Sequence, residues 1–442
     1  MINDKIDLIE KYLKLEDIQE YEILYIDRKN YETIFLRKDP ETERIVDDFE
    51  YIIRILTQKG NSTGIGVVKG NSLVPKEIIK NIETCRLISK YNISSEYHFP
   101  IKNKTQTLPL ADKTILKNPI EIKRDLSQEL IRAVEEQEGI EPTFGRFRIH
   151  TQKKFLRNSN ELDLNAMKTY FFIELALKSE KNGKLSELWT TRYYKEKEQL
   201  KFQSRVEKWA KLAKDALSAK PPKPNKEAVV VFSPYVLREA IVPVIGFHAL
   251  GKAFSEKVSN YNINDKVASE EVSIIDNGLL DGGLNSNPWD GEGNPHQKTE
   301  IITDGIFQNR LFDEKYAILE NMKSTGNGIR SVNGAVRNGV SNLQIHPGKI
   351  PLEEVILSIK EGYFIEKFSW LYPDELSGFF GAEIRNGYYI KNGEFQHPIK
   401  LGNISGNILE MIKNCMYISK ETEFVENSQL PYMVFNNLTV SS

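Results

Sequence analysis

Glycine-containing turns divide the second half of this 442-residue chain into short segments. After Val229 such turns recur about every 10–15 residues, a spacing typical of short antiparallel strands. Asn-Gly pairs stand at 277–278, 333–334, 338–339, 386–387 and 392–393. Both residues adopt the positive φ angles of two-residue hairpin turns, so each pair is a strong hairpin signal. Only 235–257 and 351–361 have a helical pattern here. We therefore expect a mainly antiparallel, curled β-sheet domain over residues 223–442.

The first half mixes helical and strand patterns, which predicts an α+β fold. Apolar residues at helical spacing indicate helices at 4–20, 75–91, 125–138 and 206–217, with Leu87 and Ile88 facing inward in the second of these. Strands are expected at 22–26 and 31–36 around a turn at 27–30, and at 144–150, 169–177 and 186–194. A polar, proline-containing segment at 97–118 and a proline cluster at 221–224 mark the boundaries. We predict an N-terminal α/β-type domain at 1–105 and a middle one at 106–222.

Charge and cysteine content restrict the function and the compartment. The chain has 60 basic and 62 acidic residues, a net charge of -2, so no overall field would recruit nucleic acid or an anionic membrane. The strongest apolar run, 240–250, is about half the 20 residues needed to span a bilayer. Cys85 and Cys415 are the only cysteines, and the N-terminus lacks the apolar run of a signal peptide. We expect a cytoplasmic protein that binds neither membranes nor nucleic acid directly.

Two places in the sequence could carry chemistry, and each also has a purely structural interpretation. His248 could be a general base, or a hydrogen-bonded core residue in the apolar run from Val244. The loop Ser324-Thr325-Gly326-Asn327-Gly328 could hold a peptide carbonyl or carboxylate on its backbone N–H groups, or be an ordinary tight turn. No two of the six histidines have the spacing of metal ligands, although a fold can gather ligands from distant segments.

Several motifs in a fixed order resemble the TldD/PmbA, or modulator-of-DNA-gyrase, metallopeptidase family. They are Asn287–Gly293, Ile301–Ile306, Ser324–Gly328, His346-Pro347-Gly348, Gly387–Glu394 and Ile404-Ser405-Gly406-Asn407. Each motif alone is a common turn pattern, so the resemblance depends on their shared order. The last motif resembles the PmbA/TldE branch more than the TldD branch.

The resemblance places this chain among members without a metal site. Catalytic members carry a His-Glu-x-x-x-His helix, and Gly251 aligns Phe247, His248 and Lys252 with its first His, its Glu and its second His. An alignment on Glu239 instead puts Arg238 and Pro243 at the two His positions. Neither set supplies zinc ligands, because phenylalanine and proline donate nothing and a cationic side chain repels the ion. The family's C-terminal Cys is also missing from 423–431.

The resemblance implies a PmbA/TldE-type subunit of a heterodimeric peptidase, acting on unfolded or modified peptides, including leader-peptide removal. A TldD-like partner would supply the divalent metal, zinc, while this chain holds no cofactor or metal and no catalytic residue other than the candidate His248. Without that partner we expect a homodimer. Contacts with an extended peptide in the shared cavity are expected from Phe247, His248, Lys252, Ser324, Thr325, Gly326, Asn327 and Gly328.

Two other classes of function remain open. The chain could be an active homodimeric hydrolase with an unrecognised metal site. It could also be a noncatalytic regulatory or binding protein of topoisomerase-related function.

Overall fold

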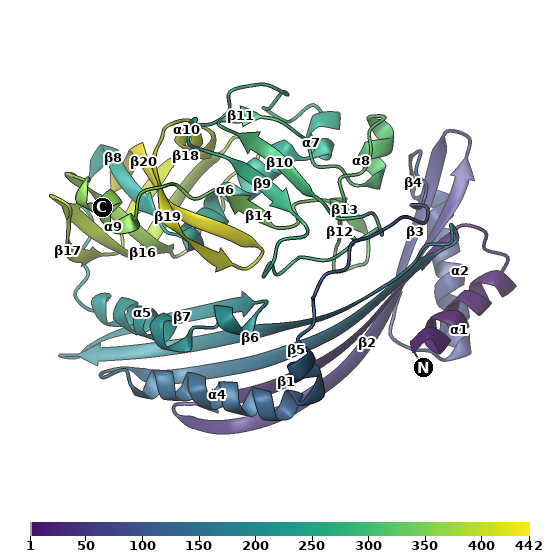
Figure 1. Cartoon of the computed structure of the whole chain (residues 1–442), viewed down its shortest axis with the longest axis horizontal. Helices are drawn as coiled ribbons and strands as arrows, with labels where there is room; N and C mark the ends of the chain where they lie inside the picture. Colours follow the sequence, from purple (N-terminus) through teal and green to yellow (C-terminus); the bar gives the residue numbers. More distant parts are fainter. Residues whose placement is uncertain (1) are drawn as a thin grey trace.

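A long curved sheet organises the first half of the computed structural model, which describes residues 2–442 and the side chains of residues 4–442. Seven antiparallel strands run in the order β4-β3-β2-β1-β5-β6-β7 (Figure 1). They are β1 (Tyr21–Leu36), β2 (Asp39–Lys59), β3 (Ser62–Gly70), β4 (Ile93–Ser95), β5 (Glu141–Asn158), β6 (Asp163–Lys181) and β7 (Lys184–Tyr194). Because β1 pairs with β5, one sheet crosses the boundary expected near residue 105. The division of residues 1–222 into two domains stays a prediction.

The two faces of this sheet have different neighbours, since successive side chains of a strand point to opposite sides. Along β1, β2, β5 and β6 the odd-numbered residues, such as Phe147 and Phe171, pack under the helices, whereas the registers of β3 and β7 reverse this numbering. Even-numbered residues such as Leu24 and Leu156 face the second half of the chain and pack around Trp289. The helices of this half are α1 (Ile2–Leu15), α2 (Pro75–Tyr91), α3 (Lys113–Lys117), α4 (Pro119–Glu135), the 3-10 turn η1 (Lys197–Gln199) and α5 (Phe202–Asp215). The even-numbered face is therefore the side on which a site between the halves can form.

The turn predicted at 27–30 is wrong, because β1 runs through it without a break. The polar residues that suggested a turn have partners on the neighbouring strand. Arg28 pairs with Asp48 at 3.4 Å, and Lys29 pairs with Asp47 at 3.6 Å. Cross-strand ion pairs thus hold a charged segment in the extended conformation.

The second half is a curled sheet around an apolar helix, packed over the first half (Figure 1). Strands β20, β18, β16, β15 and β8 form a ring, closed by pairing of β20 with β8. Strand β20 also pairs with β14, β18 and β19. The strands are β8 (Asn225–Phe232), β9 (Ile274–Asn277), β10 (Lys298–Thr303), β11 (Ile306–Phe307), β12 (Gly328–Arg330), β13 (Val336–Asn338), β14 (Leu343–Ile345), β15 (Glu361–Phe368), β16 (Phe379–Lys391), β17 (Glu394–Ile399), β18 (Asn403–Asn407), β19 (Cys415–Val425) and β20 (Ser428–Ser441).

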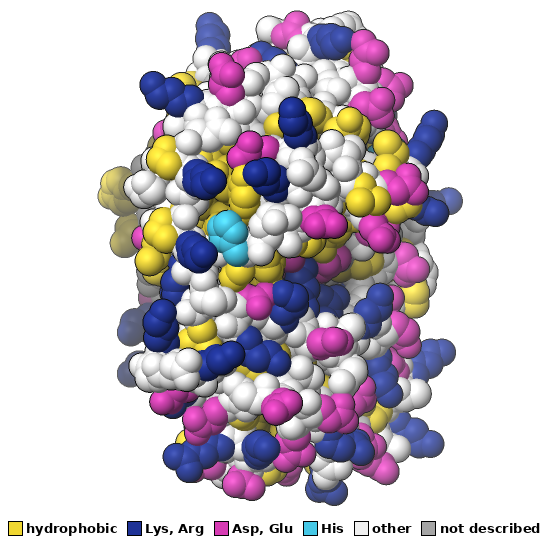
Figure 2. Space-filling model, turned by 90° about the vertical axis from the view of Figure 1, so that its left-hand side faces the viewer, with side chains coloured by type: hydrophobic (Ala, Val, Ile, Leu, Met, Phe, Trp, Pro, Cys, Tyr) yellow, Lys and Arg dark blue, Asp and Glu magenta, His cyan; other side chains and the backbone are white. Residues whose placement is uncertain are grey.

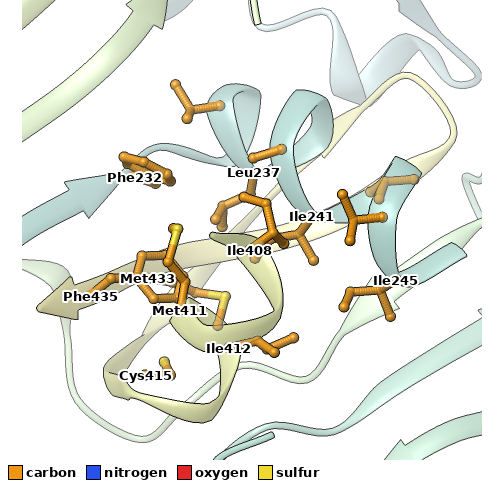
Figure 3. Close-up of a cluster of buried hydrophobic side chains, with 14 of the residues drawn as sticks. Phe232, Leu237, Ile241, Ile245, Ile408, Met411, Ile412, Cys415, Met433 and Phe435 are labelled. Atoms are coloured by element: carbon orange, nitrogen blue, oxygen red, sulfur yellow. The ribbon is translucent and has the colours of Figure 1, made fainter. Parts of the chain in front are cut away.

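The core of this half lies between the ring and its helices. Figure 3 shows Phe232 of β8, Phe435 of β20 and Met411 of α10 converging with Leu237 and Ile241 of α6. The helices are α6 (Pro234–Ala249), α7 (Gly251–Ser255), α8 (Glu314–Leu319), α9 (Leu352–Leu357) and α10 (Ile408–Lys413). The α+β architecture with a curled C-terminal sheet confirms the predicted fold class. Within residues 2–442, no helix combines the length and the apolar character needed to cross a bilayer.

Helices α8 and α10 contradict the expectation of only two helical segments in this half. Each is one or two turns long, too short to show a helical period in the sequence. Each begins after a side chain that resembles a turn signal: Asp313 accepts the N–H of Tyr316 at 3.0 Å, and Asn407 accepts that of Leu409 at 2.9 Å. Asp and Asn are preferred in turns and at helix N-caps for the same reason, their short hydrogen-bonding side chains.

Candidate functional site

Helix α6 carries the segment in which the sequence predicted a site. Its N-cap is Ser233, whose hydroxyl accepts the N–H of Val236 at 3.4 Å, and Pro234 lies in the first turn, where its missing N–H costs nothing. Its residues are buried on nearly all sides, as expected for a helix inside a core. Phe247 and His248 lie in its last turn, and Lys252 follows in α7.

His248 is a core residue in this fold. Its side chain is fully buried, with the rings of Phe247 and Tyr261 centred 5.2 Å from the imidazole. Nδ1 accepts the backbone N–H of Asn260 at 3.1 Å. Burial lowers the pKa of His248, and the neighbouring carbonyl of Leu376 only partly opposes this effect. The imidazole is therefore neutral at pH 7, and its Nδ1 lone pair is already engaged.

The hairpin of β12 and β13 connects Lys252 to the loop 324–328. The backbone N–H of Lys252 donates to Oδ1 of Asn338 at 3.1 Å, and Asn338 pairs with Gly328. The Lys252 side chain is exposed, whereas Asn327 is buried and donates to Oδ2 of Asp276 at 2.6 Å. The structure thus brings together the predicted residues at one end of α6.

Four of the five backbone N–H groups of the loop already have acceptors within the chain. Those of Thr325 and Asn327 donate to the carbonyl of Phe312, that of Gly326 donates to Oγ of Ser324, and that of Gly328 donates to Oδ2 of Asp290. An anion would have to displace these bonds, so the role of the loop in holding a ligand stays a prediction.

These residues do not fit a metal centre. Phe247 has no donor atom, Lys252 is cationic, and the available nitrogen of His248 is buried. Across the described part of the chain, no three His, Cys, Asp or Glu side chains gather as a possible metal site. Both cysteines are buried, and burial raises the pKa of each thiol to about 12, which keeps them protonated and unreactive.

A cavity of about 270 Å³ lies between the even-numbered face of the first sheet and loops of the second half. Its lining includes Gln152 and Lys154 of β5, Lys168 of β6, and Trp289, His296 and Arg330. A second hollow of about 560 Å³ adjoins it and shares Gln152, Lys154 and Lys168. Figure 2 shows both basic and acidic side chains at the surface where the two halves meet. Sequence reasoning missed this cavity; its only local signal is the alternation of polar residues along β5.

The cavity is lined by more basic than acidic side chains. Burial lowers the pKa of Lys154 to about 8 and that of Lys168 well below its usual value, and Lys154 adds repulsion at Lys168. Burial also lowers the pKa of His296 to about 4. The carboxyl of Asp290, in contrast, has a pKa well above its usual value, because it is buried beside Glu292. The lysines therefore meet little compensating negative charge from the walls.

Replacing His150 should change how stability depends on pH. Burial lowers the pKa of folded His150 to about 3, whereas unfolded histidine binds a proton below about pH 6.5. Stability contributed by the neutral imidazole is thus lost as pH falls, by about 1.4 kcal/mol per pH unit. Asp276 and Asp313 have the opposite effect on stability in this range. Their pKa values are raised to about 6 and about 7 in the folded protein, so protonating them as the pH falls favours the folded state. The measurement is therefore the difference between wild type and His150→Gln in urea unfolding from pH 7 to 4.

Below pH 6 the wild type should lose stability faster than His150→Gln. The exposed His346 provides a matched control, and His346→Gln should follow the wild-type curve. Parallel curves for wild type and His150→Gln would contradict a neutral, buried imidazole.

The C-terminal half of the chain is similar in sequence to known metallopeptidases. Residues 225–442 match the family model of the PmbA/TldA metallopeptidase C-terminal domain. A metalloprotease TldD homologue of Buchnera aphidicola is 32% identical over 210 residues, which are 46% of this chain and 44% of that protein. An uncharacterised protein of Methanocaldococcus jannaschii is 30% identical over 264 residues, 59% of this chain and 60% of its own length. The chain thus spans about half the length of these curated relatives.

The likeness of fold covers the whole chain. The crystal structure of TldE from Thermococcus kodakarensis matches with a TM-score of 0.86 and 20% identity, covering 100% of both chains. At this identity the likeness establishes the fold, including the seven-stranded sheet that the family model does not cover.

Proposed function

We propose that this chain, whose residues 225–442 match the C-terminal domain model of the PmbA/TldA metallopeptidase family, acts as a PmbA/TldE-type subunit of a peptidase complex whose metal is held by a TldD-type partner. The observation that carries this proposal is the end of α6, where Phe247, buried His248 and Lys252 offer no metal centre. The TldE-like fold supports the same assignment. Activity then requires a second chain.

In this proposal the contribution of the chain is a wall of the peptide chamber. The hollows between the seven-stranded sheet and the loops above it, of about 270 Å³ and 560 Å³, are too small for a folded domain, so only an extended, unfolded or modified peptide would enter. We propose that Lys252, which is exposed, and the half-buried Phe247 and Ser324 contact the peptide. Buried His248, with Thr325, Gly326, Asn327 and Gly328, would hold these residues in place. The two free cysteines support a cytoplasmic location.

Reconstitution with a TldD-type partner tests the assignment. We expect cleavage of an unstructured peptide, and a stoichiometric divalent metal, only when this chain is mixed with a partner carrying an intact His-Glu-x-x-x-His motif. The measurements are peptide cleavage followed by mass spectrometry and metal analysis of each purified species. Size-exclusion chromatography of the mixture should show a complex of both chains.

A partner in which the motif Glu is replaced by Gln is the matched control. This mixture should still form the complex and bind metal but should cleave no peptide, because the general base is lost. Chelator-sensitive cleavage by this chain alone would overturn the proposal and favour a homodimeric hydrolase.

A further inference from the structure

We propose that the cavity between the first sheet and the loops of the second half binds a carboxylate, held by Lys154 and Lys168. This site lies in the chain itself, so the inference stands whether or not the chain acts with a metal-bearing partner. It concerns residues outside the His-Glu-x-x-x-His alignment and outside the loop 324–328, apart from glycines that line the cavity wall.

The strand register brings the two lysines to one place. In the pairing of β5 with β6, Lys154 lies opposite Ala166 and Gln152 lies opposite Lys168. The lysines are therefore diagonal neighbours on the same face, with Cα atoms about 7–8 Å apart, within reach of each other for long side chains. Two ammonium groups at this spacing can approach one carboxylate from two sides.

Neither lysine has a counter-charge within hydrogen-bonding reach. Among residues 4–442, the ammonium group of Lys154 makes no hydrogen bond or ion pair. Glu50, the acidic group that acts on Lys154, is already paired with Arg28 and Lys69. Lys168 donates only to the backbone carbonyl of Leu284. Burial and mutual repulsion therefore disfavour the charged form of both lysines, and a bound carboxylate would stabilise that form.

The other charged groups of the cavity are occupied. Arg330 donates to Glu22 and to the carbonyls of Gly291 and Gly334. The carboxyl oxygens of Asp290 accept the N–H groups of Glu292, Asn294 and Gly328. The two lysines are therefore the groups left to bind a ligand, and their charge selects an anion.

The rest of the lining indicates an anion with an organic body. Leu24, Trp289 and Ile329 provide apolar surface beside the lysines, and the side-chain amide of Gln152 can donate. At about 270 Å³ the cavity is near the lower limit for small-molecule sites. The ligand is thus a small carboxylate or the carboxylate end of a longer chain that continues into the adjoining hollow. A free dicarboxylate and a peptide C-terminus share this chemistry.

Calorimetric titration of the purified chain tests the proposal with three probes: acetyl-trialanine, its C-terminal amide, and succinate. We expect acetyl-trialanine to bind at least ten-fold more tightly than its amide, because the amide cannot accept charge-assisted bonds from both lysines. Binding of succinate as well would identify free small carboxylates as ligands, and binding of the peptide acid alone would identify a peptide end.

Variants at the lysines separate charge from folding. K154M/K168M should weaken binding of the peptide acid at least ten-fold, whereas K154R, which keeps the charge, should retain most of it. Lys153 is the matched control, because it lies next in the same strand but points to the opposite face, so K153M should bind like wild type. Thermal melting followed by circular dichroism reports whether each variant is folded.

Two outcomes would overturn the proposal. One is equal affinity for the peptide acid and its amide. The other is unchanged affinity for the peptide acid in K154M/K168M, or in the single variant K154M if the double variant does not fold. Because the titration uses this chain alone, its failure leaves the assignment as a peptidase subunit untouched.

Discussion

Replacing Arg54 by methionine should lower the free energy of unfolding by about 3–5 kcal/mol, the usual cost of breaking a buried ion pair from one side. Arg54 is 3% exposed and lies opposite Glu22 in the pairing of β1 with β2. Its guanidinium lies 3.4 Å from Glu22 and 3.9 Å from Glu292, and 5.0 Å from the ring of Tyr97. Without Arg54, two carboxylates remain buried with less positive charge near them.

This network joins the two halves of the molecule. Arg54 and Glu22 belong to the first sheet, whereas Glu292 and Arg330 come from the second half. The Tyr97 hydroxyl also donates to Glu292, at 2.7 Å. The variant should therefore reduce both the urea midpoint and the cooperativity of unfolding, as the halves separate more easily.

Two further variants make the Arg54 test specific. Arg37→Met removes an arginine whose side chain is 80% exposed and whose nearest carboxylate oxygen, on Glu141, lies 3.6 Å away, so it should change stability by less than about 0.5 kcal/mol. Arg54→Met with Glu292→Gln should lose less than the sum of the two single changes, because the residues interact. A loss below about 1 kcal/mol for Arg54→Met would contradict this account of the interface.

Replacing Phe435 by alanine should cost about 3–5 kcal/mol, the range for removing a fully buried aromatic ring. Phe435 is 0% exposed on β20, and its ring centre lies 5.6 Å from that of Phe232 on β8 in an edge-to-face arrangement. Phe232 contacts Phe368 and Phe380 in the same way. The ring therefore packs where β20 and β8 close the curled sheet (Figure 3).

The matched control is Phe379→Ala, because Phe379 is 64% exposed on β16 and removing it should leave no cavity. Thermal unfolding followed by near-ultraviolet circular dichroism compares the two variants. If Phe435→Ala melted within a few degrees of Phe379→Ala, the closed ring of strands would not be the stabilising feature described here.

Local sequence patterns predicted strands and some turns, but they did not show whether a given glycine lies in a turn or inside a strand. Asn392-Gly393 forms the two-residue turn between β16 and β17, with φ angles of 52° and 78°, as the pair predicts. Asn386-Gly387 lies inside β16 instead. There a Cβ on Gly387 would come within 2.7 Å of the carbonyl oxygen of Phe364, so close approach of two backbones requires this glycine. The dipeptide is the same in both places, and only the neighbouring strand distinguishes them.

Helical spacing located α2 but not its buried side. Ile78, Ile82 and Cys85 face the sheet, whereas Leu87 and Ile88 are 56% and 37% exposed, contrary to the expectation that they point inward. Apolar residues surround this helix more widely than one stripe, so periodicity alone permits two orientations. Packing against β2 and β3 selects one of them.

The two candidate sites also differ in how much of each the sequence could predict. The sequence indicated the end of α6 because a short motif lies in consecutive residues, and the structure places those residues together. Lys154 and Lys168 gave no such signal. Their proximity depends on the register of β5 with β6, and their enclosure depends on loops more than 100 residues away in sequence. Contacts of this range are absent from local patterns.

The position of β20 has a consequence for folding during synthesis. Residues 428–441 pair with four other strands, including β8, which is made about two hundred residues earlier. Until β20 emerges from the ribosome, the apolar edge of β8 and the helix α6 beside it lack their main covering strand. Partly made chains should therefore expose strand edges that associate with one another, and they become targets for chaperones that bind unpaired strands.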